Sequence, residues 1–458
     1  MKMNRRNLIK TAGATALMSA AAMGRPAEFT AHAADTSGYK ALVCLFLFGG
    51  VDGHDVLIPT DAASYDQYSG IRQSLLSSYG SARARENLLD LGNLGPDVTG
   101  GRRFGLPPEM PQLHALYQAG QAAIVPNVGP LIEPVTKSAI SAETATLPRR
   151  LFSHNDQQST WLSGSTEGAQ LGWGGLFADA ILSGNGNTSF STIDVGNGGL
   201  FLTGDSTLPY RVSSSGPSSI SLTEDNNGFA ASVEEHLRFS TSLERNLISR
   251  DVMSIIRNSI DDNAFFKRAF DGSNDLRSSF EGNNLSNQLR TVARTISIRS
   301  QLQASRQIFF VFLGGFDSHS AQASGLPPRL ARLDNAIGEF QTVMNTMGLT
   351  NDVTLFTASD FGRTLAINGD GTDHGWGNHH FVVGGGVNGG RVYGDIAPPL
   401  LDGDFDVGGG RLIPQWSVEQ MASPLGEWFG LSPAEIRNAL PNVANFDAGP
   451  SGLFSGSG

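Results

Sequence analysis

The chain has 458 residues, of which 40% are hydrophobic and 16% charged, and its formal net charge is −11. This composition is typical of a globular protein and excludes a disordered one. The acidic balance argues against nonspecific nucleic-acid binding, because neutralising phosphates requires clustered lysine and arginine. The length is sufficient for one large α/β domain with insertions.

Residues 1–33 are typical of an export signal. Arg5 and Arg6 form a paired basic start, the run 11–24 is Ala-rich, and cleavage is expected after Ala33. The paired arginines resemble a twin-arginine signal, and the alternatives are an ordinary secretory signal or a membrane anchor. We therefore expect the twin-arginine export machinery as a partner, export in the folded state, and a bacterial periplasmic or secreted location. No later run reaches the ~18 apolar residues that a spanning helix needs, so no membrane segment is expected after the signal is removed.

The first elements after the signal predict the start of an α/β domain. Residues 41–48 are continuously apolar and end at a pair of glycines, which predicts a strand buried on both faces. Cys44 lies in this strand and is the only cysteine, so it is expected to be a buried hydrophobe, and no intrachain disulfide can form. Residues 110–119 have helical spacing, and 122–125 form a short apolar run, so the two predict one helix followed by a strand.

The middle of the chain predicts an insertion at about 183–306. Residues 183–228 are rich in Gly, Ser, Asn and Thr, which favours loops and short strands. From Gly228 onward, apolar residues recur with helical spacing, including the stretch 285–298. This rhythm predicts two or three helices that flank or cap the domain.

Strands and helices alternate again toward the C-terminus. Residues 308–313, 353–357 and 381–383 predict strands, and 326–347 predicts an amphipathic helix between the first two. Such alternation favours a mostly parallel central sheet with helices on both faces.

The last segments complete the predicted domain. Residues 417–440 predict two short helices, and the Gly- and Ser-rich residues 448–458 predict a flexible tail. The α/β domain is therefore expected to span 34–447.

Acidic and imidazole side chains gather where the predicted strands end. In open α/β sheets, ligands bind beyond the carboxyl ends of the strands, and imidazole and carboxylate groups are the usual metal donors there. Any single aspartate of this kind could instead shape a turn or cap a helix. The residues concerned are Asp52, Asp317, His319, Asp360, His374, His379 and His380.

Four of these strand-end segments together resemble a known family. The segments are GGVDG, GGFDSH, SDFGR and TDHGWGNHH. They resemble exported proteins of domain of unknown function 1501, which in turn are similar to the alkaline phosphatase and sulfatase superfamily. The resemblance covers nearly all of the chain after the signal, and it implies an alkaline-phosphatase-like α/β sandwich with metal at the carboxyl ends of the strands.

The resemblance also implies a set of metal ligands. Phe361 stands where the superfamily has a histidine, and His379 is expected to supply the missing imidazole. A donor set rich in histidine favours Zn²⁺ or Mn²⁺, with Mg²⁺ or Ca²⁺ as alternatives. The expected ligands are Asp52, Asp317, His319, Asp360, His374 and His379.

The superfamily carries its nucleophile at the start of a helix after the second strand. The matching segment offers the hydroxyls of Ser153, Ser159 and Thr160, none of them in a recognisable nucleophile motif, and Ser159 or Thr160 is the expected nucleophile. His154 and Asp156 in the same segment are alternative metal ligands. Arg363, which follows the third strand-end aspartate, is expected to hold a substrate oxygen, and a plain ion pair is the other interpretation.

These features predict an exported metal-dependent hydrolase of phosphate or sulfate esters, acting on a small-molecule or polysaccharide substrate. The ions would polarise the ester oxygens and activate a hydroxyl or water. The alternative is a non-catalytic metal-binding relative that acts as an envelope binding protein or a secretion partner. The retained Asp and His residues favour the hydrolase, whereas Phe361 and the absent nucleophile motif favour the alternative.

Overall fold

A computed structural model describes residues 34–220, 232, 235, 247–384 and 386–455. The predicted export signal and most of the segment 221–246 lie outside the described residues. In the described part of the chain, no helix is both long and apolar enough to cross a membrane.

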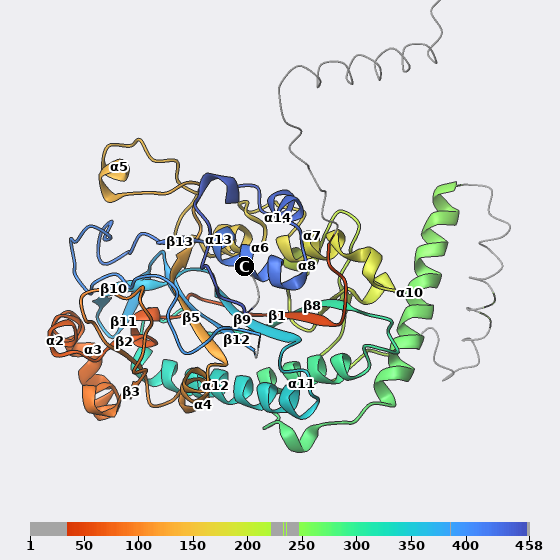
Figure 1. Cartoon of the computed structure of the whole chain (residues 1–458), viewed down its shortest axis with the longest axis horizontal. Helices are drawn as coiled ribbons and strands as arrows, with labels where there is room; N and C mark the ends of the chain where they lie inside the picture. The colour runs from red at the N-terminus through yellow and green to blue at the C-terminus, as the bar shows by residue number, and fades with distance from the viewer. Residues whose placement is uncertain (1–33, 221–231, 233–234, 236–246, 385, 456–458) are drawn as a thin grey trace, which may run out of the picture. The chain divides into compact units, whose positions relative to one another are not determined.

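An eight-stranded sheet forms the centre of the domain, with the order β13-β5-β12-β9-β1-β8-β6-β7 (Figure 1). β1 is parallel to both of its neighbours, β8 and β9, whereas β12 runs antiparallel to β9 and β5. The carboxyl ends of β1, β8 and β9 therefore lie at one edge. The strands are β1 Lys40–Leu47, β5 Ala122–Gly129, β6 Thr192–Asp194, β7 Tyr210–Arg211, β8 Arg306–Leu313, β9 Val353–Ser359, β12 Asn378–Val383 and β13 Trp416–Ser417.

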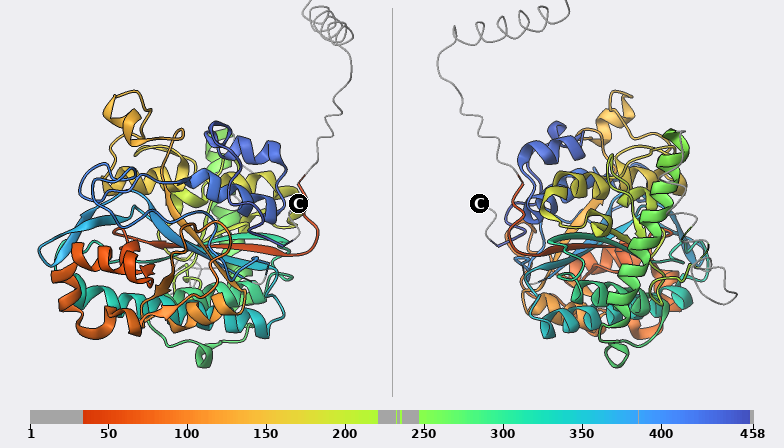
Figure 2. Two further views of the ribbon diagram at one scale, coloured as in Figure 1. Left: turned by 60° about the vertical axis from the view of Figure 1, so that its left-hand side comes forward. Right: turned by 90° about the vertical axis from the view of Figure 1, so that its right-hand side faces the viewer.

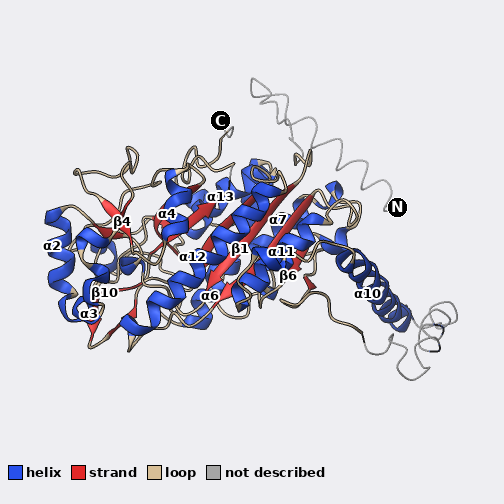
Figure 3. Ribbon diagram, turned by 90° about the horizontal axis from the view of Figure 1, so that it is seen from below, coloured by secondary structure: helices blue, strands red, loops and turns tan. Residues whose placement is uncertain are grey.

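Helices cover both faces of this sheet, as Figures 1 and 2 show. One face carries α4 Pro111–Gln118, α11 Asn284–Ser297 and α12 Gln322–Thr346. The other carries α6 His154–Ser163, α7 Trp173–Ala180, α8 Gly199–Leu202, α13 Val418–Phe429 and α14 Pro433–Ala439. α10 Leu247–Asp271 packs through its C-terminal part and extends away from the other described helices in Figure 3.

Strand β1 shows why the sheet is buried on both sides. Val43 and Leu45 join the hydrophobic cluster under one helix layer, and Leu42, Cys44 and Phe46 join the cluster under the other. Successive side chains of a strand point to opposite faces, so a run without polar residues requires two covered faces. The predicted α/β class, with a mostly parallel sheet and helices on both faces, is confirmed, and Cys44 is buried as expected.

Two smaller sheets lie beside the large one. β10 Arg363–Asn368 and β11 Gly371–His374 form an antiparallel hairpin. β2 Ile58–Pro59, β3 Leu89–Asp90 and β4 Phe104–Leu106 form a three-stranded sheet, flanked by α2 Ala62–Ile71 and α3 Gln73–Ser78, and α5 Lys137–Ser141 is a separate short helix. The hairpin was not predicted from the sequence, because its strands are polar and do not alternate cleanly.

The C-terminal residues differ from the predicted flexible tail. Leu453 and Phe454 are buried, and the ring of Phe454 stacks on Trp428 with 5.3 Å between centroids. The backbone N–H of Asn388 also donates to the carbonyl oxygen of Leu453 at 2.9 Å. Two apolar side chains therefore fix a segment whose Gly and Ser content alone predicts disorder.

Candidate metal centre

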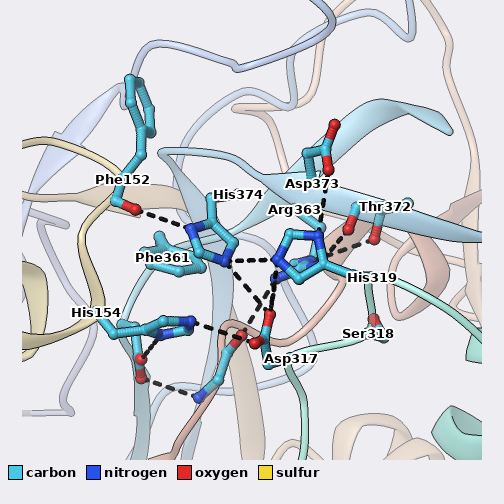
Figure 4. A network of polar contacts seen from close by, with 12 residues as sticks. Phe152, His154, Asp317, Ser318, His319, Phe361, Arg363, Thr372, Asp373 and His374 are labelled. Carbon is cyan, nitrogen blue, oxygen red and sulfur yellow. Dashed lines mark hydrogen bonds and ion pairs between the residues drawn. The ribbon is translucent and has the colours of Figure 1, made fainter. Parts of the chain in front are cut away.

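Imidazole and carboxylate groups from three separate segments meet beyond the carboxyl edge of the large sheet (Figure 4). Asp317 and His319 follow β8, His374 ends β11, and His154 is the first residue of α6. Because β1 and β8 are parallel neighbours, the loops after both strands meet at this edge.

Gly49, directly after β1, allows this convergence. Its φ is +112°, and a Cβ atom there would lie 2.4 Å from the backbone nitrogen of Asp317. Only glycine tolerates both this backbone conformation and so close an approach. The glycine pair after the first strand therefore serves to admit the chain that carries Asp317.

A backbone carbonyl on the side of the ring away from Asp317 fixes the orientation of His374. Its Nδ1 lies 2.8 Å from the carbonyl oxygen of Phe152, which can only accept, so Nδ1 carries the proton and donates. The Nε2 of the neutral ring is then a bare lone pair, 3.3 Å from Oδ1 of Asp317. Burial lowers the pKa of His374, and the neighbouring Arg363 lowers it further, which keeps the ring neutral.

His154 is oriented in the same manner by Asp360. Its Nδ1 lies 2.6 Å from Oδ2 of Asp360, a carboxylate that is fully buried. The Nε2 of His154 is buried without a hydrogen-bond partner and faces Oδ2 of Asp317 at 3.5 Å. The hydrogen bond to Asp360 raises the pKa of His154, as expected for an imidazole made more basic by a carboxylate behind it.

His319 is the third imidazole and the most exposed. Its Nδ1 lies 3.2 Å from Oδ1 of Asp373, and its Nε2 lies 3.2 Å from Oδ1 of Asp317 and 2.9 Å from Nε2 of His374. Each ring nitrogen of His319 therefore has a carboxylate oxygen at 3.2 Å. With its proton on Nε2, His319 donates to Nε2 of His374. With its proton on Nδ1, it donates to Asp373, and two lone pairs then face each other across 2.9 Å unless a cation lies between the rings.

The three Nε2 atoms thus converge on a single carboxylate. One ligand atom from each of His154, Asp317 and His374 lies within 4.8 Å of the others. Histidine ligands to metals commonly donate their other ring N–H to a carboxylate or a backbone carbonyl, which is the arrangement present here. The orphaned Nε2 of His154 and the bare Nε2 of His374 both face Asp317, and the three groups fit a divalent cation held by nitrogen and oxygen donors.

Arg363 forms an ion pair with Asp317. Its Nη1 donates to Oδ1 of Asp317 at 2.9 Å, and its Nε and Nη2 donate to Thr372. Although burial opposes ionisation of Asp317, this hydrogen bond and the guanidinium charge lower the pKa of the carboxyl overall. The guanidinium was predicted to hold a substrate oxygen, but its donors are already bound within the chain, so it positions an ionised Asp317.

Three predicted ligands lie outside this convergence. Asp52 is fully buried and paired with Arg72, with 2.7 Å between Oδ2 and Nη1. Asp360 lies behind His154 and also accepts from the backbone N–H of Gly49 and from Gln158, so its oxygens face away from an ion. His379 is buried in β12, where its Nδ1 accepts from the backbone N–H of Asn127 at 3.0 Å.

The hydroxyls predicted as nucleophiles are engaged in α6 and the loop that follows it. Ser159 donates to the carbonyl oxygen of Thr166 at 2.9 Å, and Thr160 donates to that of Asp156 at 2.7 Å. Both lie one to two turns away from the start of the helix, which is occupied by His154. Neither hydroxyl contacts the converging imidazoles.

Phe361 forms an apolar floor for the centre. Its ring centroid lies 4.4 Å from that of His374 and 4.8 Å from that of His154. The side chain is fully buried. Where the resemblance implies a second-metal histidine, the structure therefore has a packing surface that holds two imidazoles in place.

Comparison with known proteins gives the family. The model of the family "Protein of unknown function (DUF1501)" matches residues 39–398. The chain belongs to this family. No curated protein matches it.

Solved structures resemble the DUF1501 chain at a distance. One is from a study of how Bacteroides thetaiotaomicron metabolises multiple glycosaminoglycans, with 11% identity over 88% of this chain and 75% of that one and a TM-score of 0.33. Another is the alkaline phosphatase of the Antarctic bacterium TAB5, with 10% identity, 88% and 99% coverage and a TM-score of 0.31. A third is a 2-O GAG sulfatase, with 9% identity, 87% and 72% coverage and a TM-score of 0.27.

Sequence reasoning gave no firm role to three groups of this centre. His154 was only an alternative ligand, because nothing in its segment shows that the start of α6 faces Asp317. The carbonyl oxygen of Phe152 could not be predicted as a partner of His374, because a backbone group leaves no mark in the amino-acid sequence. Phe152 has a φ of +73°, an uncommon conformation for a non-glycine residue. Asp373 directly precedes His374 in the sequence. Its contact with His319 depends on the β10–β11 hairpin, which the sequence did not predict.

Proposed function

We propose that this DUF1501 protein is a metal-dependent hydrolase of phosphate or sulfate esters. The observation that carries the proposal is the convergence of three imidazole Nε2 atoms on Asp317, each ring held by an acceptor behind it. His154, Asp317 and His374 would hold one divalent ion, and their mixed nitrogen and oxygen donors favour Zn²⁺ or Mn²⁺ over Mg²⁺ or Ca²⁺. Such an ion supplies charge that polarises the ester oxygen and lowers the pKa of water.

Water, and not a side chain, is the proposed nucleophile. The hydroxyls of Ser159 and Thr160 are bound to backbone carbonyls, and a histidine occupies the helix start where the superfamily carries its nucleophile. A direct attack by water splits the ester into the acid and the alcohol in a single displacement. No covalent intermediate with the chain is then formed.

His319 is the group placed to accept the proton of that water. Its side chain is 45% exposed, against 28% for His154 and 21% for His374, so it lies at the open side of the centre. With the Nδ1–H of His319 donated to Asp373, its Nε2 can take a proton, as in a catalytic imidazole supported by a carboxylate. The same imidazole, once protonated, returns the proton to the leaving alcohol. This role replaces the predicted one of metal ligand.

The test uses the mature chain, which here means residues 34–458, loaded with Zn²⁺ or Mn²⁺. Its hydrolysis of aryl and alkyl phosphates and sulfates is measured. His319→Gln should keep its metal and lose about 10²-fold or more in kcat. His374→Ala should lose both metal and activity, and Ser159→Ala and Thr160→Ala should keep both. His114→Ala, a histidine on α4, is the matched control.

Two results would overturn this proposal. A loaded chain that hydrolyses none of these esters would leave the non-catalytic, metal-binding alternative. A folded Ser159→Ala or Thr160→Ala variant that retains metal but loses activity would restore a hydroxyl nucleophile.

We also propose that the protein is exported in the folded state to the periplasm or beyond by the twin-arginine machinery. The support is the paired Arg5-Arg6 start of the sequence and the small-residue cleavage pattern that ends at Ala33. Replacing both arginines with lysine should retain the full-length chain in the cytoplasm. Secretion of that variant with normal cleavage would contradict the assignment.

A further inference from the structure

A pocket of about 560 Å³ lies next to the candidate metal centre. The two share Gln158, which lines the pocket and whose Nε2 donates to Oδ2 of Asp360 at 2.8 Å. That same oxygen accepts from Nδ1 of His154 at 2.6 Å. One amide and one carboxylate therefore connect the lining of the pocket to the imidazole that faces Asp317.

The walls of the pocket are apolar. Phe48, directly after β1, and Phe312, near the end of β8, lie edge to face with 5.6 Å between ring centroids. Both rings are partly exposed, although most phenylalanines at the ends of buried strands are covered. Leu162 from α6 and Leu200 from α8 complete the walls. Such surfaces bind the apolar face of a ring.

The rest of the pocket lining is largely polar and carries no positive charge. Asn155 and Asn197 are exposed amides, and Gln158 is a third amide in the lining. Glu167 is the only charged residue among the described residues that line the pocket. Amides can donate to and accept from hydroxyl groups, whereas a carboxylate in a lining without Lys or Arg disfavours an anion there.

We propose that this pocket binds the alcohol part of the ester as an uncharged, hydroxyl-bearing ring. The inference rests on the proposed function, because it takes the ester bond to lie at the metal centre and the leaving group to lie in the pocket. It adds a substrate class: esters of a sugar or phenolic ring are favoured, and esters that carry a second negative charge on the leaving group are rejected.

The first test measures binding and needs no turnover. Phenyl β-D-glucoside and phenyl β-D-glucuronide differ by a single carboxylate and are titrated against the full mature chain by saturation-transfer NMR, with and without EDTA. The uncharged glucoside should bind at least about tenfold more tightly, and EDTA should not change its affinity. Methyl β-D-glucoside and phenol, titrated separately, show whether the sugar or the aryl ring fills the pocket.

Variants tie the binding to this pocket. Phe312→Ala removes one aromatic wall, and Ala169→Trp fills the pocket from its lining. Each should weaken glucoside binding by at least about tenfold. Phe265→Ala is the matched control, since this partly buried ring on α10 stacks on Phe190, outside the pocket. It should bind the glucoside as the wild type does.

The outcomes separate this inference from the proposed function. Equal affinity in wild type, Phe312→Ala and Ala169→Trp, or tighter binding of the glucuronide, would overturn the ring pocket even if the loaded chain hydrolyses esters. Binding that follows the variants in a chain without hydrolytic activity would keep the pocket and reject the hydrolase. If both hold, Phe312→Ala should also remove the preference in kcat/KM for phenyl over methyl esters.

Discussion

Two groups of carboxylates follow neighbouring strands of the sheet, and they differ in the groups that face them. Asp52 and Asp55, after β1, are fully buried against Arg72, Tyr68 and Tyr79. Their oxygens are bound by a guanidinium and by hydroxyl donors, at 2.7 Å from Arg72 to Asp52 and 2.6 Å from Tyr68 to Asp55. Each carboxylate oxygen of the first group therefore has a hydrogen-bond donor.

The group around Asp317, after β8, is incomplete. Its carboxylate is 44% exposed, and apart from Arg363 it is faced by imidazole nitrogens, of which those of His154 and His374 have their acceptors on the opposite side of the ring. A carboxylate faced by donors is a structural element, whereas one faced by lone pairs leaves space for a cation. The groups that face an aspartate, more than the aspartate itself, therefore distinguish a candidate metal site from a buried ion pair.

The largest effect is expected from breaking the complete group. Arg72→Met leaves two buried carboxylates without their cation, which should lower the free energy of unfolding by about 3–5 kcal/mol. Urea unfolding of the variant and the wild type measures this difference in free energy. Arg103→Met, which removes an exposed pair with Asp90, is the control and should cost less than about 1 kcal/mol. Similar losses in both variants would mean that the buried group does not hold the fold.

A smaller effect is expected where the incomplete group is supported from behind. Asp360→Asn weakens the acceptor of His154 Nδ1, so Zn²⁺ affinity should fall about 10–100-fold, as measured by competition with a chelating dye. Asp373→Asn acts on His319, which accepts the proton and does not hold the ion in the proposed mechanism. Its Zn²⁺ affinity should match that of the wild type. An equal loss in both variants would make His319 a ligand.

The buried histidines of β12 predict a pH dependence unrelated to the metal. Burial lowers the pKa of His379 and of His380 to about 3, so both are neutral in the folded protein. The unfolded chain binds these protons below about pH 6.5. Stability should therefore fall as the pH drops from about 6.5 toward 3, by at most about 1.4 kcal/mol per pH unit for each histidine.

Replacing one of these histidines tests that origin. His380→Phe should reduce the slope of stability against pH, since its ring already packs beside Trp161 at 4.9 Å between centroids. An unchanged slope in His380→Phe, measured by urea unfolding at several pH values, would assign acid sensitivity to other groups.

The smallest effect is expected from His319→Ala on stability. The imidazole is 45% exposed and is held mainly by the equally exposed Asp373, so the free energy of unfolding should change by less than about 0.5 kcal/mol. Thermal unfolding of the metal-free chain measures it. A loss as large as that of Arg72→Met would show that His319 is part of the structural core.

The sequence predicted the strands well because they are continuous apolar runs. It also located Asp317, His319 and His374, since each follows or precedes such a run. The sequence could not show that Asp52 and Asp360 are not ligands. The partner of Asp52 is Arg72, 20 residues away on another element, and the partner of Asp360 is His154. His379 looked like a ligand for the same reason: periodicity does not show which histidines of a cluster face the core of β12.

Metal content tests the central claim most directly. The mature chain is incubated with Zn²⁺ or Mn²⁺, gel-filtered and subjected to elemental analysis, beside the double variant His154→Ala/His374→Ala and the control His114→Ala. We predict about one equivalent of metal in the wild type and the control, and almost none in the double variant. Wild type without metal after this treatment, or a double variant with the same content, would contradict the metal centre and with it the hydrolase.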